Sequence, residues 1–515
     1  MWRKAGGAVL ISAAVLVFAW TASCGRNATP IVSPDDSGTG GTPDGGPGAD
    51  GGPGTDGGPG TDGGVGTDGG PGTDGGTDGG IVITFPNLTG WQFYGTQHGG
   101  PRTVYGVTSD RGGNVWVAGG EEGLFLLKPG SSTYRRYTMS DGLRPYGYMP
   151  DGSDPPGDKY LKVISVSGGP ANTVFVGYQG KPPAPGHFNC EFSWYGPDFP
   201  PPLQEPRDPS VYKSGDADRV TLQAGDRLSV VHYDIFTGPG IIRDELEGRE
   251  KICDILRIVY DPLTQSVWFG GNHGFAWGDA NYAGNPTCNG QLACSGVREH
   301  SHPAINAWGD EARTSVILLT GDYYGMSVDP IGDLWAGGAA RSTHFGYVTY
   351  GRDFFTAGDH TEASQYISNR IDVWPDRVGE PNYPLPSERV DDWVSDMAAM
   401  PDGSVWISSF TNSGLAHYTP GRPIEYLRDP VTSTVTGLER DARDNSLWIG
   451  YTYGGFARLR GSQYVPYDFR VLGQDLVQGK IPDIQSDNFG GTRRILVAFF
   501  GGAGRPGAIG IYSGD

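Results

Sequence analysis

The sequence predicts an all-β fold built from one repeated unit, and three observations support this. A short phrase recurs seven times: a turn, then apolar residues centred on an aromatic, then small residues and glycine. Gly and Pro separate short runs of alternating apolar and polar residues, and the two ends of the repeat region complement each other. One such unit cannot bury its apolar face alone, so neighbouring units must stack. The phrase centres are Trp116, Phe175, Trp268, Trp335, Trp406, Trp448 and, in a degenerate copy, Leu496.

The spacing of the phrase predicts the kind of repeat. The shortest distance between two centres, from Trp406 to Trp448, is 42 residues, which matches a four-stranded β-propeller blade of about 40–45 residues. The first unit predicts strands at 104–109, 115–118, 124–128 and 134–138. The fifth predicts them at 394–399, 405–408, 415–418 and 424–427.

The ends of the repeat region predict how the ring closes. The last unit stops after a third strand at 508–512, while the region opens with a lone strand at 91–94. Pairing these two strands would complete the last blade and remove the exposed sheet edges. We therefore expect a seven-bladed β-propeller closed by an N-terminal strand and preceded by a disordered Gly/Asp-rich linker.

The first residues predict export. A basic start is followed by a short apolar run and then small residues that end at Cys24, and such a run is too short to span a bilayer as a helix. The segment resembles a bacterial lipoprotein signal, which implies cleavage before Cys24, lipidation of that residue, and anchoring at the outer membrane or cell surface. Residues 1–23 are the expected signal peptide, 24–80 the lipidated cysteine and linker, and 81–515 the propeller.

The linker and the net charge limit the partners. Asp-Gly-Gly triplets dominate the linker, and their composition predicts disorder. Residues 81–515 hold 35 basic and 49 acidic side chains, a net charge of −14. An acidic surface repels phosphate backbones, which argues against a nucleic-acid ligand. The lipid anchor is the only membrane contact that the sequence predicts.

Four cysteines remain after Cys24, an even number that favours disulfides in an exported protein. Three pairings are possible. Cys288 and Cys294 would close a short loop, which leaves Cys190 to pair with Cys253.

The repeat also resembles a known propeller motif. A turn aspartate and glycine precede the Trp phrase, and Gly123-Leu124 and Gly414-Leu415 follow it. This pattern is similar to the two-component regulator propeller repeat of bacterial sensor ectodomains, which implies a propeller fold and a binding role. The chain shows no kinase or DNA-binding segment, so signal transduction is not expected from the resemblance.

Two groups of residues are candidates for a site. Carboxylates predicted at the entries of three consecutive inner strands would surround the channel mouth and suit Ca²⁺ or a cationic ligand, although such aspartates also serve as turn formers. An aromatic-rich insertion would suit a protein or glycan partner, unless its rings pack on the propeller. The carboxylates are Asp254, Asp322, Asp391 and Asp392, and the aromatics are Phe192, Trp194 and Tyr195.

We therefore expect an envelope lipoprotein whose propeller binds or scaffolds an envelope protein or glycan. No hydrolase elbow, phosphate loop or zinc-protease motif is present in the sequence, so a non-enzymatic role is favoured. A metal-dependent propeller hydrolase or lyase with its site at the channel mouth is one alternative. A structural coat protein of the envelope is another.

Overall fold

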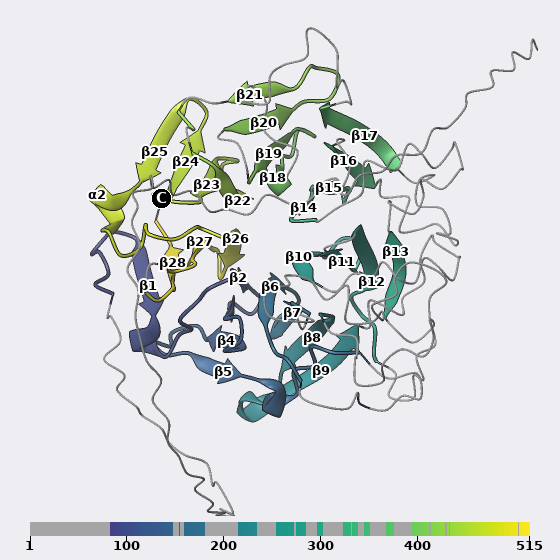
Figure 1. The fold of residues 1–515 in the computed structure, drawn as a ribbon, viewed down its shortest axis with the longest axis vertical. Helices are drawn as coiled ribbons and strands as arrows, with labels where there is room; N and C mark the ends of the chain where they lie inside the picture. Colours follow the sequence, from purple (N-terminus) through teal and green to yellow (C-terminus); the bar gives the residue numbers. More distant parts are fainter. Residues whose placement is uncertain are drawn as a thin grey trace, which may run out of the picture. The chain divides into compact units, whose positions relative to one another are not determined.

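The computed structural model describes residues 83–147, 154, 159–180, 215–233, 254–271, 274–284, 296–301, 323–330, 332–337, 345–350, 367–374, 394–410, 414–427, 430–431, 433–502 and 504–514. Within these residues the strands form a β-propeller, made of seven hydrogen-bonded sheets of four strands each (Figure 1). None of the helices in the described part is long and apolar enough to cross a membrane.

The strands of the first three sheets follow one another along the chain. The first holds β2 (Gly106–Ser109), β3 (Val115–Ala118), β4 (Leu124–Leu127) and β5 (Arg135–Tyr137). The second holds β6 (Val163–Gly168), β7 (Thr173–Tyr178), β8 (Ala217–Leu222) and β9 (Leu228–Tyr233). The third holds β10 (Ile255–Asp261), β11 (Ser266–Gly271), β12 (Gly274–Asp279) and β13 (Val297–Ser301).

The next three sheets repeat the same order. The fourth holds β14 (Gly325–Val328), β15 (Leu334–Gly337), β16 (Phe345–Tyr350) and β17 (Ile367–Trp374). The fifth holds β18 (Val394–Ala399), β19 (Val405–Ser409), β20 (Leu415–Tyr418) and β21 (Glu425–Leu427). The sixth holds β22 (Val435–Arg440), β23 (Leu447–Tyr451), β24 (Phe456–Arg460) and β25 (Gln463–Tyr467). Short helices are η1 (Thr96–His98), η2 (Met139–Asp141), η4 (Ala224–Asp226) and α2 (Phe469–Leu472).

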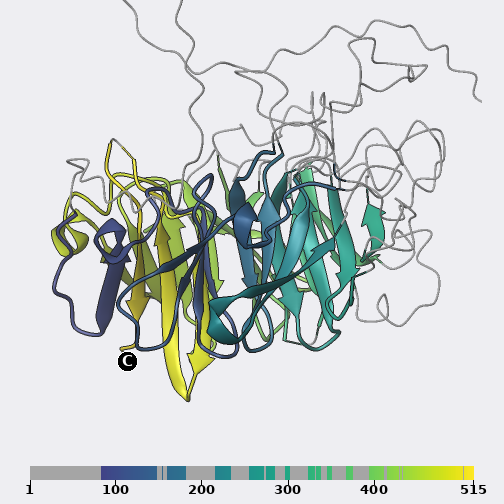
Figure 2. The same ribbon diagram turned by 90° about the horizontal axis from the view of Figure 1, so that it is seen from below.

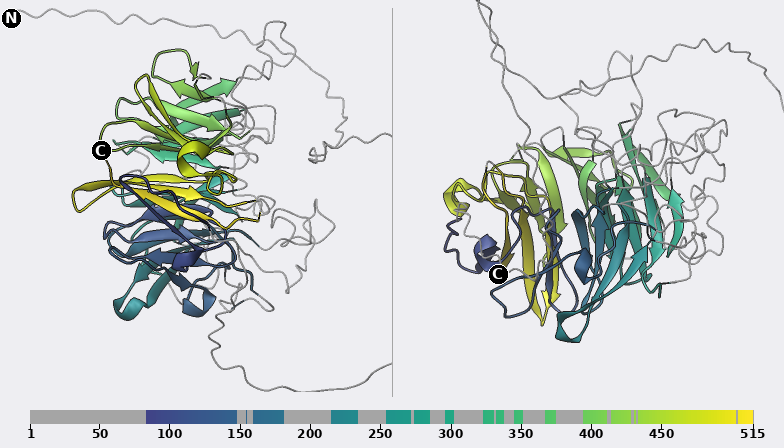
Figure 3. Two further views of the ribbon diagram at one scale, coloured as in Figure 1. Left: turned by 90° about the vertical axis from the view of Figure 1, so that its left-hand side faces the viewer. Right: turned by 60° about the horizontal axis from the view of Figure 1, so that its bottom comes forward.

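The seventh sheet joins the two ends of the propeller. It holds β26 (Ile484–Phe489), β27 (Thr492–Phe499) and β28 (Ala508–Tyr512), with β1 (Trp91–Gly95) as its outer strand (Figure 3). β1 pairs antiparallel with β28, from Trp91 opposite Tyr512 to Gly95 opposite Ala508. The closure predicted from the sequence is therefore confirmed. Trp91 and Phe93 pack into the same apolar cluster as Phe456 and Phe499.

The first strand of every sheet lies at the centre of the ring, and the strands run between its two faces (Figures 1 and 2). β2, β6, β10, β14, β18, β22 and β26 each contact the next strand in this series, and β26 contacts β2. A blade count of the ring nevertheless gives six, not the seven that the sequence predicts. Nothing in the hydrogen bonding accounts for the difference.

The repeated phrase forms the second strand of each sheet. Every residue of β3 and β7 is buried, because the apolar faces of neighbouring sheets cover both sides of these strands. Trp116, Phe175, Trp268 and Trp448 are among the most deeply buried large side chains. The prediction that the phrase aromatics are core residues is confirmed for these four.

In several sheets the residue at the end of the inner strand supplies an acceptor for the indole of the phrase tryptophan. Asp110 accepts a hydrogen bond from Trp116 Nε1 (2.9 Å), and Asp441 accepts one from Trp448 Nε1 (3.1 Å). The second sheet has Gly169 at this position and Phe175, which has no donor, in place of Trp. A buried indole N–H requires an acceptor, so in the first and sixth sheets the aspartate and the tryptophan form one unit.

Candidate functional site

The inner strands line a central channel in register. We number their positions back from one aligned residue in each sheet, which stands at the end of the inner strand in six sheets and within β26 in the seventh: Asp110, Gly169, Asp261, Asp329, Met400, Asp441 and Asp487. Side chains alternate between the two faces of a strand, so positions four and two before the aligned residue point to the same side. The same backbone N–H position receives a side-chain hydrogen bond at several sheet boundaries, which confirms the alignment.

Position −4 forms an ionic layer across the channel. Arg257 of β10 donates through Nη2 to Asp396 of β18 (Oδ1, 3.1 Å) and through Nη1 to Asp483, just before β26 (Oδ1, 3.2 Å). These residues come from the third, fifth and seventh sheets, so the contacts must cross the centre of the ring. The other sheets have small residues at position −4: Gly106, Ser165, Gly325 and Gly437.

The carboxylates of this layer also hold neighbouring sheets together. Asp396 Oδ2 accepts from the backbone N–H of Leu438 (2.9 Å), and Asp483 Oδ2 accepts from that of Val107 (3.0 Å). A Cβ at Gly106 would lie 3.3 Å from Asp483 Oδ2, so glycine leaves room for the carboxylate. Each aspartate thus bonds to the arginine and to the next sheet.

Position −2 supplies hydrogen-bond acceptors in four of the sheets, next to the ionic layer. The hydroxyls of Thr108, Ser167 and Ser327 accept from the backbone N–H groups of Gly168 (2.8 Å), Tyr260 (3.1 Å) and Ala399 (3.1 Å) in the following sheets. In the sixth sheet the residue is Glu439, whose Oε1 accepts from the N–H of Ser486 (3.0 Å). Glutamate therefore replaces a hydroxyl and brings a second oxygen into the channel.

Glu439 is the most perturbed acid of the channel. Burial, which disfavours the charged form, raises the pKa of Glu439 to about 8; Arg257 opposes this change and Asp396 adds to it. Burial likewise raises the pKa of Asp396 to about 6 against the effect of Arg257. Arg257 is shared by the carboxyls of Asp396, Asp483 and Glu439, so this cluster has more acid than base. Arg440 also lines the pocket, and its Nη1 donates to Asn445 (3.1 Å).

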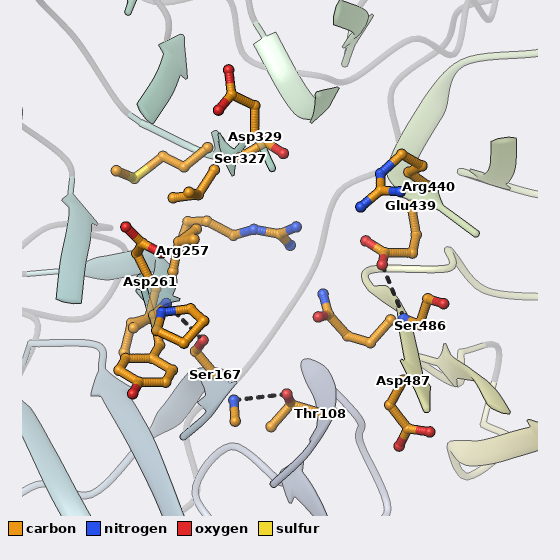
Figure 4. A pocket seen from close by; sticks show the side chains of 18 of the residues that line it. Thr108, Ser167, Arg257, Asp261, Ser327, Asp329, Glu439, Arg440, Ser486 and Asp487 are labelled. Carbon is orange, nitrogen blue, oxygen red and sulfur yellow. Dashed lines mark hydrogen bonds between the residues drawn. The ribbon is translucent and has the colours of Figure 1, made fainter. Parts of the chain in front are cut away.

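These layers form the walls of a pocket of about 480 Å³ (Figure 4). The pocket lies at the turn ends of the inner strands, and residues of all seven sheets line it. Figure 4 shows Arg257 and Glu439 pointing into it from opposite sides, with Thr108, Ser167 and Ser327 around them. A second hollow of about 480 Å³ shares Ser109, Gly168, Tyr260, Pro262 and Asp487 with the first and continues toward Arg111 and Phe489.

Most acids of the pocket have partners, and Glu439 differs from them. Asp261 accepts from the N–H groups of Leu263 (2.8 Å) and Thr264 (3.2 Å). Asp329 accepts from the N–H of Asp333 (2.9 Å), and Asp487 pairs with Arg494. Within the described residues, Oε2 of Glu439 has no hydrogen-bond partner.

The residues that the sequence singled out lie elsewhere. Asp254 is buried at the strand-entry end of the channel, opposite the pocket, and its Oδ1 accepts from the N–H of Gly180 (2.8 Å). The other candidates lie outside the described residues: Asp322, Asp391, Asp392, Phe192, Trp194, Tyr195, Cys24, Cys190, Cys253, Cys288 and Cys294. In the part of the chain that the structure describes, no three His, Cys, Asp or Glu side chains are grouped to hold a metal ion. The Ca²⁺ site and the disulfide pairings stay predictions.

The sequence contains a signal for the residues that this reasoning missed. Glu439 and Arg257 lie nine and eleven residues before Trp448 and Trp268, and Asp396 lies ten before Trp406. Counting back from the phrase aromatic therefore finds the channel-facing positions. Charged residues at these positions stand out, because the other sheets have Gly, Ser or Thr there in most cases.

No protein-family profile matches the sequence, and no curated protein matches it. Solved structures with a similar fold include the extracellular domain of the two-component system protein BT3049 from B. thetaiotaomicron (TM-score 0.44, 12% identity, 83% of this chain and 41% of that chain). PorZ, a surface component of the type-IX secretion system of Porphyromonas gingivalis, gives a TM-score of 0.44 at 14% identity over 80% of this chain and 47% of that chain. YCF48 from Cyanidioschyzon merolae gives 0.43 at 12% identity over 82% and 99%. The chain spans less than half the length of the first two, and likenesses this weak carry no argument about function.

Proposed function

We propose that the propeller is a binding module that takes a positively charged group of its partner into the channel pocket. The main support is the carboxyl of Glu439, which lies in the channel and has one oxygen without a hydrogen-bond partner among the described residues. A pocket of about 480 Å³ falls in the range of about 300–1,000 Å³ typical of ligand sites. A lysine or arginine side chain of an envelope protein is the expected occupant.

The raised pKa of Glu439 gives this binding a specific signature. Near neutral pH the empty pocket keeps a proton on Glu439. A cation next to the carboxyl favours its charged form, so the ligand takes the place of the proton. Binding is therefore coupled to proton release, and affinity rises with pH until Glu439 ionises without the ligand.

Isothermal titration calorimetry with a short lysine-containing peptide tests this proposal, with the acetyl-lysine version of the same peptide as the matched probe. We expect the free lysine to bind, with a heat that varies with the ionisation enthalpy of the buffer. Acetylation and Glu439→Gln should each weaken binding about tenfold or more, the scale of a charge-assisted hydrogen bond. Equal affinity for both peptides, or a heat independent of the buffer, would refute the pocket as a cation site.

We also propose that the module is exported and held at the outer membrane or cell surface by a lipid on Cys24. The apolar run before Cys24 and the Gly/Asp-rich linker after it support this. Labelling growing cells with an alkyne fatty acid should mark the wild-type chain and leave Cys24→Ser unmarked. Equal labelling of the two chains would contradict the anchor.

We count seven blades in the ring. The support is that each of the seven sheets has four strands in the same hydrogen-bonded order and that their inner strands contact one another in a closed series, within the described residues. An experimental structure of residues 81–515 settles the number directly. A ring with six inner strands would contradict this count.

A further inference from the structure

Two lysines lie at the end of the channel opposite the pocket. Lys162 directly precedes β6, and Lys480 lies four residues before β26. Tyr105 directly precedes β2, and Phe500 directly follows β27. The entries of three inner strands and the end of a second strand thus bring these four side chains to one mouth of the channel.

Both ammonium groups lie on aromatic rings. Lys162 Nζ is 5.5 Å from the centre of the Tyr105 ring, and Lys480 Nζ is 4.9 Å from that of Phe500. The two rings meet edge to face, with their centres 5.1 Å apart. The backbone N–H of Phe500 donates to the carbonyl of Lys480 (3.1 Å), so strand pairing fixes the lysine relative to the ring beneath it.

Neither lysine has an acidic partner. Among the residues described, no carboxylate lies within ion-pairing distance of either ammonium group, and both side chains are half-buried. Two acids at this end of the channel have other contacts: Glu121 accepts from the hydroxyl of Tyr160 (3.2 Å), and Asp254 accepts from the N–H of Gly180 (2.8 Å). Burial, and secondarily the charge of Lys162, lowers the pKa of Lys480.

Two like charges held close together on aromatic faces repel each other, and a bridging anion would remove that repulsion. Lysine is a common ligand of phosphate groups, which it binds as a point charge. We infer that Lys162 and Lys480 together bind a tetrahedral oxyanion, a phosphate or sulfate group, at this mouth of the channel. The site is separate from the cation pocket, because the Arg257 layer lies between the two ends.

Lysine acylation read by mass spectrometry tests this on the folded protein. With inorganic phosphate about tenfold above its Kd, Lys162 and Lys480 should react about tenfold more slowly than in chloride of equal ionic strength. Lys128, which pairs with Asp226, should react at the same rate in both and serves as the internal control. Equal rates for all three lysines in the two buffers would overturn the inference.

Variants separate the lysine pair from a general charge effect. Lys162→Gln should abolish protection of Lys480 by phosphate, and it should also slow acylation of Lys480 because the pKa of Lys480 rises when its positive neighbour is removed. Lys128→Gln, the matched control, should change neither result. If Lys480 remains protected in Lys162→Gln with an unchanged thermal melt, the pair is not the site.

A second arm identifies the source of the oxyanion. Vesicles containing phosphatidic acid present the same group on a lipid, and we compare them with neutral vesicles that carry free inorganic phosphate in solution. Protection only by the lipid form assigns a headgroup, and protection only by free phosphate assigns a soluble ligand. Protection in neither arm overturns the inference.

Discussion

Glu439→Gln should change how the stability of the propeller depends on pH. The unfolded chain releases this proton near its ordinary pKa of 4.5, whereas the folded chain keeps it to about pH 8. Between these values the native state binds more protons than the unfolded state, so the free energy of unfolding falls as the pH rises. Glutamine keeps the shape and the hydrogen bond to Ser486 but has no proton to lose.

The size of the effect follows from the width of that window. For one titrating group, the free energy of unfolding falls by about 1.4 kcal/mol with each pH unit inside this window. Between the two pKa values of Glu439, the free energy of unfolding can fall by at most roughly 5 kcal/mol. Water that reaches the channel reduces this loss. We therefore expect Glu439→Gln to gain a few kcal/mol relative to the wild type between about pH 5 and pH 8.

Urea unfolding of the wild type and Glu439→Gln, measured in steps across this range, provides the assay. Glu121→Gln, at an exposed position in the turn between β3 and β4, is the matched control, and we expect its difference from the wild type to vary far less with pH. The reasoning fails if the difference between Glu439→Gln and the wild type is the same at every pH. Such a result would mean that Glu439 ionises in the folded state as it does in the unfolded chain.

Three further substitutions test how the ring is held together. Asp441→Asn should destabilise the fold by about 2–5 kcal/mol in thermal or urea unfolding, because Arg493 and Arg458 lose a buried charged acceptor; an effect below about 0.5 kcal/mol would contradict this role. Gly168→Ala should cost at least about 2 kcal/mol, since its Cβ would lie 1.8 Å from the carbonyl oxygen of Ser109, whereas Gly130→Ala, with open space around its Cβ position, should cost less. Deleting the residues up to and including Gly95 should leave the edge of β28 exposed. We expect aggregation, measured by light scattering, or binding of a hydrophobic dye, measured by fluorescence. A monodisperse product with an unchanged melt would show that β1 is dispensable.

The sequence predicted the fold well because its signal is local. Most second strands contain an aromatic flanked by apolar residues, and in the first, fourth and sixth sheets an aspartate of the turn bonds to the indole. The strands expected at 115–118 and 394–399 have the same limits in the structure. The closure could also be predicted, since a missing strand at one end and a spare strand at the other are visible without coordinates.

The sequence predicted the kind of side chain in the site, acidic residues around the channel, but not which residues these are. The sequence suggested acids around the channel, but the prediction placed them at the strand entries and so selected Asp254. That residue lies at the strand-entry end and bonds to a backbone N–H. Arg257, Asp396 and Asp483 meet because the third, fifth and seventh sheets face one another across the ring. No pattern along the sequence shows which sheets will face one another across the ring.

The pairing of β1 with β28 has a consequence for biogenesis. β1 leaves the ribosome long before β28, so the seventh sheet cannot form on a nascent chain that still lacks residues 508–512. The joint between the two ends therefore sets the moment at which folding finishes.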